Sequence, residues 1–530
     1  MSGPIIPFER YPGISPLFAR FLAGLPEFYP DPPTIEAAAE RGRRILGRPS
    51  RVPAGAFRFR GEAAKARAED LAAGRAVAVV AGHQVGLFTG PLFTITKAFD
   101  AIRVAREISD RGVPAVPVFW ALTDDHDLEE VARTARPGKD GPEVIVLEGA
   151  DRSNRAPVGR RAIPEGVRPI LDAFAADARA PGSEELVETL RRRYSPGTTY
   201  GEAFIESLLD LAPEGLLVLD PYQESLREAT AAFFQEAVRR EAALREALAG
   251  VSGRLEAAEL PVPVAFRAEV FPFFTIEKGE RRRVDSVADA AARIASGESW
   301  VSSDVLTRPV LKSWLMPNAA SVLGPAEIAY HAQSLPLFRV FDLEPPVLLP
   351  RSFVIPIGPP ERRAMEALGI TRENLLVPPP ERGPVEVPGA AILDGAATDA
   401  DKALDTLEPD IRALDPTLVG ALENTKKKVA YQLEQLKERM KKAVDRKNEV
   451  ANSRRRRLDS MLLPQGAPAE RLYPPLVPLL AYGPAALESI REAASGSLEG
   501  ATLAELGTEG TGTDHAEGTE GAADRSSDGR

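Results

Sequence analysis

The sequence Thr-Asp-Asp-His-Asp at positions 123–127 places three carboxylates and an imidazole next to one another. Such groups are costly to bury without partners, so they lie either in solvent or in a site that uses them. In the functional interpretation Asp124 or Asp125 orients His126, which then carries a proton or donates a hydrogen bond. In the other interpretation the loop is solvated and Asp127 caps the helix that follows.

The stretch Gly-His-Gln-Val-Gly-Leu-Phe-Thr-Gly-Pro at 82–91 is rich in glycine and precedes a helical pattern. Backbone N–H groups at a helix N-terminus bind anions, and glycine lets a ligand approach the backbone closely. The spacing is neither that of a P-loop nor that of the dinucleotide fingerprint. The stretch therefore predicts either an anion site or a tight turn from strand to helix. The residues assigned to the anion site are Gly82, His83, Gln84, Gly86, Thr89, Gly90 and, about two turns into the helix, Lys97.

The same loops could instead hold a cation. Two aspartates and two histidines, Asp124, Asp125, His83 and His126, are ligand types for zinc or for a hard cation. A metal-dependent hydrolase or a nucleotidyltransferase in the same pocket is therefore the competing enzyme class, and metal analysis of the purified protein would test the hydrolase. No metal is assigned from the sequence. His331 is either a helix residue satisfied by its neighbours or part of the site.

Two short strands and one helix must position these loops. Residues 76–81 form an apolar, β-branched run typical of a buried strand, and residues 115–122 form a second one. Pro91 and the apolar spacing after it predict a helix that continues to about residue 110. The order strand–helix–strand indicates a parallel sheet, in which ligands bind beyond the carboxyl ends of the strands. Both loops follow such strands, so we expect them to share one pocket.

The 530 residues exceed the usual size of one domain. The patterns divide them into an N-terminal part of the core, an inserted connecting region, a return to the core, a helical coiled-coil arm, a segment that docks on the core and a tail. The corresponding ranges are 1–135, 136–300, 301–360, 361–463, 464–498 and 499–530. Within the inserted region we expect a long helix over 221–249 and strands over 262–277.

Residues 419–463 carry apolar side chains at the four-then-three spacing of a coiled coil, from Val429 to Val450. Thirteen basic and five acidic residues fall within 424–459. No aromatic residues interleave the arginines, so nucleic acid is not an expected partner. We expect a solvated helix that pairs with the 402–413 segment or with a second subunit, and a homodimer held through this arm. A noncatalytic coiled-coil adaptor is the alternative, but polar motifs at several strand ends argue against it.

Composition narrows the class of protein further. The net charge is −11, of which residues 499–530 contribute −6, so the rest of the chain has no general attraction to nucleic acid. This last segment has few large apolar residues and is expected to be disordered. The absence of cysteine excludes disulfides, thiolate metal sites and a cysteine nucleophile. No apolar run is long enough for a membrane span and no signal peptide is apparent, so a soluble cytoplasmic protein is expected.

Six motifs followed by a basic coiled-coil arm resemble the cysteine-adding enzyme family of bacillithiol biosynthesis. The motifs are AGHQVGLFTGPLFTITKA, PVFWALTDDHDLEEV, TTYGEAFIESLLDL, SSDVLTRPV, LGPAEIAYHAQ and PPVLLPRSF. The resemblance covers most of residues 1–490. It implies an α/β, Rossmann-like core with a parallel sheet similar to class I nucleotidyltransferases and cysteinyl-tRNA synthetase, with inserted segments and a helical domain that supports dimerisation. Family members often have Gly-Gln-Gln where this chain has Gly82-His83-Gln84, which argues against a catalytic role unique to His83.

The resemblance implies a ligase that adds L-cysteine to glucosaminyl-malate, giving bacillithiol through a new amide bond. A carboxylate acylates an amine only after activation, and ATP is the candidate activator. In this scheme Asp125 and His126 are the catalytic residues, with His126 accepting the proton of the attacking amine. Cations for the phosphate are expected at Lys97, Arg308 and Arg351. Carboxylates that hold amino groups are expected at Asp124, Asp125 and Glu327.

Overall fold

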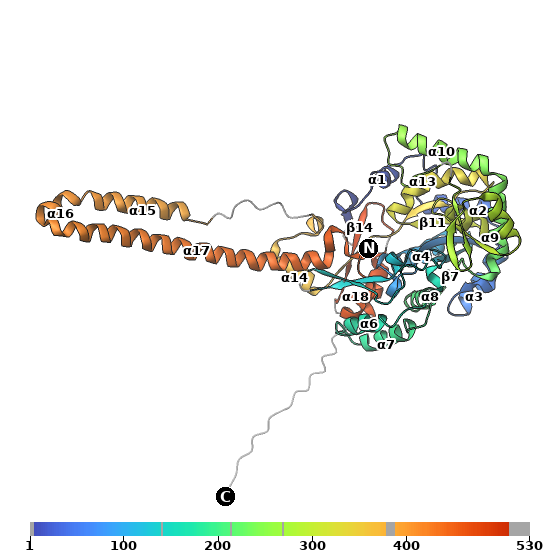
Figure 1. Ribbon diagram of the computed structural model, residues 1–530, viewed down its shortest axis with the longest axis horizontal. Coiled ribbons are helices and arrows are strands. Elements are labelled where there is room, and N and C mark those ends of the chain that lie inside the picture. The colour runs from blue at the N-terminus through green and yellow to red at the C-terminus, as the bar shows by residue number, and fades with distance from the viewer. Residues whose placement is uncertain are drawn as a thin grey trace, which may run out of the picture.

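Six strands form the central sheet of the computed structural model (Figure 1). Their order is β12-β11-β3-β4-β7-β2, and all neighbours are parallel except β2 and β7. The strands are β2 (Phe57–Arg58), β3 (Val77–Gln84), β4 (Ala115–Leu122), β7 (Leu217–Leu219), β11 (Asn318–Leu323) and β12 (Val347–Pro350). The structure describes residues 5–138, 141–212, 215–267, 270–377, 387–494 and 496–507, without the side chains of 447, 448 and 450–452.

The order of the strands reverses between β3 and β11. From β3 the chain adds β4 and then β7 on one side, and it later adds β11 and β12 on the other side. Helix α4 (Phe93–Ser109) connects β3 to the parallel strand β4, so the predicted strand–helix–strand unit and the α/β, Rossmann-like class are confirmed. In doubly wound sheets, ligands bind in the crevice beyond the carboxyl ends of the strands where the order reverses.

Each face of the sheet has its own core, because successive strand residues point to opposite faces. Val77, Val79 and Ala81 of β3 join one cluster, whereas Ala78 and Val80 join the other. The first cluster includes α2 (Ile35–Ile45), α4, α6 (Val167–Ala175), α7 (Ser183–Arg193), α8 (Tyr200–Leu211), α18 (Leu476–Tyr482) and α19 (Ala485–Ala493). The second includes α3 (Glu62–Ala72), α9 (Arg227–Arg239), α10 (Glu241–Ala257), α11 (Val287–Ala295), α12 (Arg308–Leu315) and α13 (Pro325–Val340).

The region 136–300 differs from its prediction in three ways. It is not only an insertion, because β7 is a strand of the central sheet. The helix predicted over 221–249 is two helices, α9 and α10, with Arg240 between them at φ −108° and ψ 23°. The predicted strands over 262–277 shrink to β8 (Phe273–Glu277). That strand forms a separate antiparallel sheet with two others, β9 (Glu280–Arg283) and β10 (Ser299–Ser303).

A third sheet contains the start of the tail, where the prediction of disorder is wrong. β14 (Gly500–Glu505) lies between β1 (Ile5–Pro7), which is antiparallel, and β13 (Val354–Ile357), which is parallel. Ala501 and Leu503 are buried in a cluster that also contains α1 (Pro16–Leu22) and α14 (Pro359–Leu368). The prediction used the amino-acid composition of the whole tail, and that average does not reveal a short strand of small and branched residues. Residues 508–530 lie outside the described ranges.

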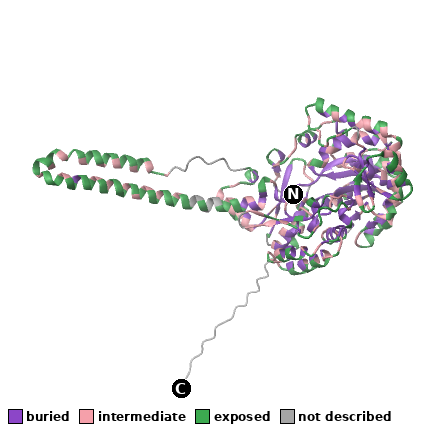
Figure 2. Ribbon diagram, in the orientation of Figure 1, coloured by how far each residue is buried: buried purple, intermediate pink, exposed green. Residues whose placement is uncertain are grey.

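A helical hairpin projects from the head of the molecule (Figure 1). It consists of α15 (Ala390–Asp405), α16 (Glu408–Leu414) and α17 (Val419–Leu462), and α15 packs along α17. Most of its residues are exposed (Figure 2). The predicted coiled-coil domain is therefore present, and α17 pairs with a segment of its own chain. None of the helices in the described ranges is both long and apolar enough to cross a membrane.

Candidate functional site at the carboxyl ends of the parallel strands

The loop that follows β4 is held by neighbouring elements. The Thr123 hydroxyl donates a hydrogen bond to Asp220, which follows β7. The backbone N–H groups of Val158 and Gly159 donate to the carbonyls of Asp125 and Thr123, at 2.6 and 3.0 Å. A Cβ on Gly159 would lie 2.4 Å from the Thr123 Cβ, so glycine is required at this close approach. These contacts fix the backbone that carries the acidic side chains.

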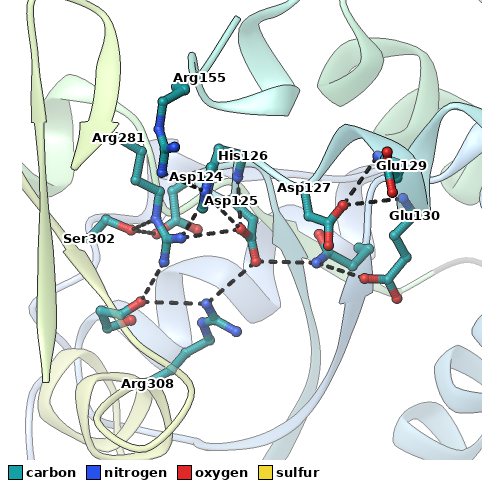
Figure 3. Close-up of polar contacts among 12 residues, drawn as sticks. Asp124, Asp125, His126, Asp127, Glu129, Glu130, Arg155, Arg281, Ser302 and Arg308 are labelled. Atoms are coloured by element: carbon teal, nitrogen blue, oxygen red, sulfur yellow. Dashed lines mark hydrogen bonds and ion pairs between the residues drawn. The ribbon is translucent and has the colours of Figure 1, made fainter. Parts of the chain in front are cut away.

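Asp125 is the centre of a charged network (Figure 3). Its Oδ1 accepts from the His126 backbone N–H at 2.7 Å and from Arg281 Nη1 at 3.2 Å. Its Oδ2 accepts from Gln84 Nε2 at 3.2 Å and lies 4.0 Å from Arg308 Nη2. Burial raises the pKa of Asp125, but hydrogen bonds from His126 and the charges of Arg281 and Arg308 outweigh it and hold the pKa well below its usual range. Asp125 is therefore a fixed negative charge at neutral pH.

His126 lies between a carboxylate and two guanidinium groups. Its Nδ1 is 3.4 Å from Asp125 Oδ1 and 3.0 Å from Arg281 Nη1, and its Nε2 is 3.3 Å from Arg155 Nη2. Arginine can only donate, so each guanidinium can bond only to a ring nitrogen that carries a lone pair. In the tautomer with the proton on Nδ1, that N–H faces Asp125 in place of the bond from Arg281, and the lone pair of Nε2, which accepts from Arg155, can take up a proton. Arg155 is exposed, so its side chain is free to leave Nε2 when a substrate arrives.

The other two carboxylates of the loop differ in their surroundings. Asp124 is 6 % exposed, and its Oδ2 accepts from the Ser302 hydroxyl at 2.7 Å. Among the described residues, Asp124 Oδ1 has no hydrogen-bond partner. Asp127 is exposed and caps α5 (Leu128–Val131) by accepting from two backbone N–H groups. The capping interpretation thus applies to Asp127, whereas Asp124 and Asp125 are turned into the protein.

Asp125, Gln84, Arg281 and Arg308 line a cleft of about 660 Å³. Its apolar wall comes from Val264, Ala265, Phe266, Val270, Pro272, Phe274, Val305 and Leu306. Its polar wall contains four arginines and two aspartates, namely Arg267, Arg281, Arg283, Arg308, Asp125 and Asp304. The Arg281 guanidinium carbon lies 3.7 Å from the centre of the Phe274 ring, which holds that cation in place. The excess of arginine makes the cleft suitable for an anionic ligand.

The glycine-rich loop does not present its backbone to this cleft as an anion site would. The N–H groups of Gly86 and Gly90 donate within the loop, and the Thr89 N–H donates to the Tyr194 hydroxyl at 3.0 Å. Phe88, Thr89 and Gly90 have φ of 53°, 69° and 71°, which is the geometry of a tight turn. Phe88 and Thr89 are buried. The turn interpretation therefore describes this loop.

Lys97 and Glu327 form a buried ion pair where the strand order reverses. The Lys97 ammonium group donates to the Gly82 carbonyl at 2.9 Å and to Glu327 Oε2. Glu327 also accepts the Gly324 N–H at 2.7 Å. Burial lowers the pKa of Lys97, and for Glu327 the charge of Lys97 lowers the pKa in spite of burial. Because each satisfies the other, neither is a free ligand-binding charge.

The two other histidines of the core are held neutral. Burial and the charge of Lys97 lower the pKa of His83 to about 4. Burial lowers the pKa of His331 to about 4 as well, and its Nδ1 donates to the Glu327 carbonyl at 2.7 Å. His331 is thus a helix histidine satisfied within α13. His83 packs against the Phe93 ring, with centroids 4.9 Å apart.

Arg351 lies in a different cluster from Arg308. Its guanidinium donates to the buried carboxylate of Glu470 at 3.0 and 2.6 Å and packs over Phe353. The Tyr11 hydroxyl donates to the same carboxylate at 2.6 Å. Arg351 therefore joins the end of β12 to the N-terminal and C-terminal segments, and it is not available as a cation for a ligand.

His83 and the acidic loop do not assemble a metal site. In the part of the chain that the structure describes, no three or more histidine, aspartate or glutamate side chains are grouped to hold a metal ion. His83 contacts Phe93, whereas His126 contacts Asp125 and two arginines. The geometry gives no support to the metal-dependent hydrolase.

Sequence reasoning missed two basic residues, Arg281 of β9 and Lys312 of α12. Arg281 lies in Glu-Lys-Gly-Glu-Arg-Arg-Arg, a pattern that indicates a turn, and only the run of arginines beside a strand could have drawn attention to it. Lys312 lies one turn after Arg308, and its Nζ is 5.6 Å from the centre of the Trp120 ring. Burial lowers the pKa of Lys312 to about 8. Its spacing from Arg308 was the available signal.

The fold and the site define a Rossmann-like α/β protein with a cationic cleft and a coiled-coil arm. Residues 54–352 match the N-terminal Rossmann-like domain of the bacillithiol biosynthesis BshC family, and residues 387–500 match its C-terminal coiled-coil domain. The chain belongs to this family.

Three similar relatives carry the name "Putative cysteine ligase BshC". The relative from Koribacter versatilis is 29% identical over 529 residues, which cover 92% of this chain and 97% of the relative. The relative from Salinibacter ruber is 29% identical over 463 residues, covering 82% and 83%. The relative from Solibacter usitatus is 28% identical over 436 residues, covering 76% and 80%.

Proposed function

We propose that this protein is a cysteine ligase that joins the carboxyl group of L-cysteine to the amino group of glucosaminyl-malate, the last step of bacillithiol biosynthesis. The observation that carries the proposal is the cleft that the ionised Asp125 lines together with four arginines, one of which, Arg281, also contacts the adjacent His126. The excess of arginine suits the two carboxylates of the malate group, because guanidinium groups bind carboxylates in two-point contacts. Family membership and the names of the relatives support the same activity.

The reaction forms a carbon–nitrogen bond and removes one oxygen from the cysteine carboxylate. A carboxylate resists attack by an amine at neutral pH, so this oxygen must first become part of a leaving group. We propose that ATP supplies a phosphate on which the oxygen departs. The residues present fit such a group, because Arg281 and Arg308 line the cleft and Arg308 Nε has no partner among the described residues.

The amino group of the sugar must attack as a neutral amine and lose a proton when the amide forms. His126 Nε2 is the atom that would take this proton, because Asp125 can accept the N–H of Nδ1. Asp125 itself cannot take it, since its pKa is held far below neutral pH. Its fixed charge can instead hold the protonated amine before the attack.

We further propose that the protein acts as a homodimer in the cytoplasm. L-cysteine and ATP are metabolites of that compartment. The arm offers a surface for a second copy, because several of its large apolar side chains are exposed, namely Ile392, Leu407, Leu414, Leu418, Tyr431 and Leu436.

The direct test incubates the protein with L-cysteine and glucosaminyl-malate, with and without ATP, and measures bacillithiol by mass spectrometry. Product that requires ATP supports both the activity and the activator. Product without ATP supports the activity and removes ATP from the proposal. A folded protein that forms no product under either condition contradicts the proposed function.

A further inference from the structure

Several polar atoms in the last residues of β3 and β4, in the loop after β4 and at the start of α12 have no hydrogen-bond partner among the described residues. Two are donors, Trp120 Nε1 and Arg308 Nε, and two are acceptors, Gln84 Oε1 and Asp124 Oδ1. The ammonium group of Lys312 likewise makes no hydrogen bond or ion pair with any described residue. Buried polar atoms of folded proteins are nearly always paired with protein, water or ligand. A concentration of unpaired atoms at one place therefore marks a binding site.

A chain of contacts and neighbours links these groups. Lys312 Nζ lies over the Trp120 ring, and Arg308 is one turn earlier on the same helix. Arg308 Nη2 is 4.0 Å from Asp125, which follows Asp124 directly. The side-chain nitrogen of Gln84 donates to Asp125, and the side-chain oxygen of Gln84 has no partner among the described residues. Figure 3 shows Arg308 pointing toward Asp125, with Asp124 beside it.

The unpaired groups fall into two sets of opposite character. Lys312, Arg308 and Trp120 can only donate, and the first two carry positive charge. Asp124 Oδ1 and Gln84 Oε1 can only accept, and Asp124 is an acid. An inorganic anion would leave the acceptors unpaired, and a metal ion would be repelled by the two cations. A small molecule with a carboxylate at one end and an ammonium group at the other satisfies both sets.

We infer that these residues form an amino-acid subsite, in which Lys312 and Arg308 bind the α-carboxylate and Asp124 with Gln84 binds the α-ammonium group. The inference rests on the proposed function, in which the amino acid is L-cysteine. It leaves the malate carboxylates to the other three arginines that line the cleft, Arg267, Arg281 and Arg283. Lys312 and Arg308 would also stabilise negative charge on the carboxyl oxygen while the amine attacks.

Calorimetric titration of the full-length protein with three ligands tests the assignment. The ligands are L-cysteine, cysteamine, which lacks the carboxylate, and 3-mercaptopropionate, which lacks the ammonium group. Lys312→Met is expected to lower the affinity for L-cysteine and 3-mercaptopropionate at least about tenfold, because it removes one charged hydrogen bond to the carboxylate. The affinity for cysteamine is expected to stay within about twofold. Asp124→Asn is expected to lower the affinity for L-cysteine and cysteamine and to leave the affinity for 3-mercaptopropionate unchanged.

Two further variants separate charge from structure. Lys312→Arg keeps the positive charge and is expected to retain most of the affinity. Lys65→Met, on an exposed lysine of α3, is the matched control and is expected to bind like the unaltered protein. Thermal melts of all variants precede the titrations. If Lys312→Met does not fold, Lys312→Arg and Asp124→Asn still test the subsite. Lys312→Arg is expected to keep most of the affinity for all three ligands, whereas Asp124→Asn is expected to weaken only the two ligands that carry an ammonium group.

Steady-state kinetics distinguish this inference from the proposed function. Lys312→Met is expected to raise KM for L-cysteine at least about tenfold while KM for glucosaminyl-malate stays within about twofold. Unchanged affinity for L-cysteine, or equal losses for both substrates, overturns the subsite and leaves the ligase standing. Binding of another amino acid that depends on Lys312, without bacillithiol formation, supports the subsite and overturns the ligase. A protein that binds no amino acid overturns the subsite.

Discussion

Asp125 and His126 are adjacent in the chain but have different chemical capacities. Hydrogen bonds from His126 and the charges of two arginines keep Asp125 ionised, so it can attract cations but cannot exchange protons near neutral pH. The imidazole of His126 is partly exposed and has one nitrogen that can be free. These surroundings are the basis for the proposed roles, a fixed charge at Asp125 and a proton acceptor at His126.

Replacing His126 by alanine should lower kcat by about 10²–10⁴-fold, because the attacking amine would lose its proton acceptor. The measurement is the rate of bacillithiol formation by protein whose fold has been checked by circular dichroism. Asp127→Asn is the matched control, since asparagine also caps helices and this residue faces solvent. Near wild-type turnover by folded His126→Ala would leave the histidine with a structural role.

Arg281 should matter far more than Arg282, its neighbour on the same strand. Arg281 contacts Asp125, His126 and Ser302 and is buried, whereas the side chain of Arg282 is 59% exposed. Arg281→Met removes one of the two cations beside Asp125 and is expected to cut kcat/KM at least about tenfold. Arg282→Met is expected to behave like the unaltered protein. Equal effects of the two substitutions would show that the network is not part of the site.

Affinity for L-cysteine should depend on the protonation of Lys312. Its pKa is lowered to about 8 by burial, so the ammonium form that binds a carboxylate is present below that pH and is lost as pH rises through it. KM for L-cysteine is therefore expected to rise above about pH 8. The amino acid also titrates, but equally for both proteins, so the ratio to Lys312→Arg isolates the lysine. A constant ratio from pH 6 to 10 would contradict the assignment.

The site could be predicted in part. Gln84 contacts Asp125 beside His126 because the loops that follow the parallel strands β3 and β4 meet at one edge of the sheet, whereas Arg308 is brought to Asp125 by α12. Arg281 could not be placed, because it comes from a hairpin far along the chain whose position depends on tertiary packing. Residue type also misleads where a partner is invisible from the sequence: Arg351 has a suitable charge, but Glu470 already satisfies it.

At the scale of elements, short strands proved hardest to anticipate. The unit β3–α4–β4 has long apolar runs with clear periodicity, and it was predicted. β7 has three residues, and β14 is embedded in a tail whose average composition is polar. Six residues that fit between two existing strands gain their hydrogen bonds from those neighbours, a contribution that no average over thirty residues reveals. The order of strands across the sheet likewise depends on long-range pairing.

Removing residues 500–530 should lower the melting temperature by several degrees. The truncation exposes the edges of β1 and β13 and removes the buried Ala501 and Leu503. Together these changes are expected to lower the free energy of unfolding by roughly 3 kcal/mol or more. Removing residues 508–530 is the control and is expected to leave the melt unchanged, because their composition offers little apolar surface. Identical melts for the two truncations would show that β14 adds no stability.

A single substitution tests the same strand without shortening the chain. A Cβ on Gly500 would lie 1.9 Å from the Ile6 carbonyl oxygen, so Gly500→Ala must separate β14 from β1. We expect a fall in melting temperature. Gly395→Ala on α15 is the control, since nothing lies within 4 Å of that position and alanine favours a helix by about 1 kcal/mol.

At the scale of the whole molecule, the arm exposes large apolar side chains to solvent. Leu414 is 81% exposed and Leu436 is 47% exposed, although α15 already packs along α17. Leu414→Asp combined with Leu436→Asp should shift the sedimentation coefficient from dimer toward monomer, because charge is costly in an apolar contact. Gln432→Asp, at an exposed position of the same helix, is the control. If the double variant sediments like the unaltered protein, the proposed homodimer is not held through this surface.

The sheet formed by β1, β14 and β13 has a consequence for synthesis of the chain on the ribosome. Its strand β1 is made among the first residues, but its neighbour β14 ends at residue 505, after every strand of the central sheet and the whole arm. A nascent chain can therefore complete the strands of the central sheet while β1 still has an open edge, the kind of edge that pairs with other chains. The protein should be most prone to co-translational aggregation in this interval, which closes only when β14 leaves the exit tunnel.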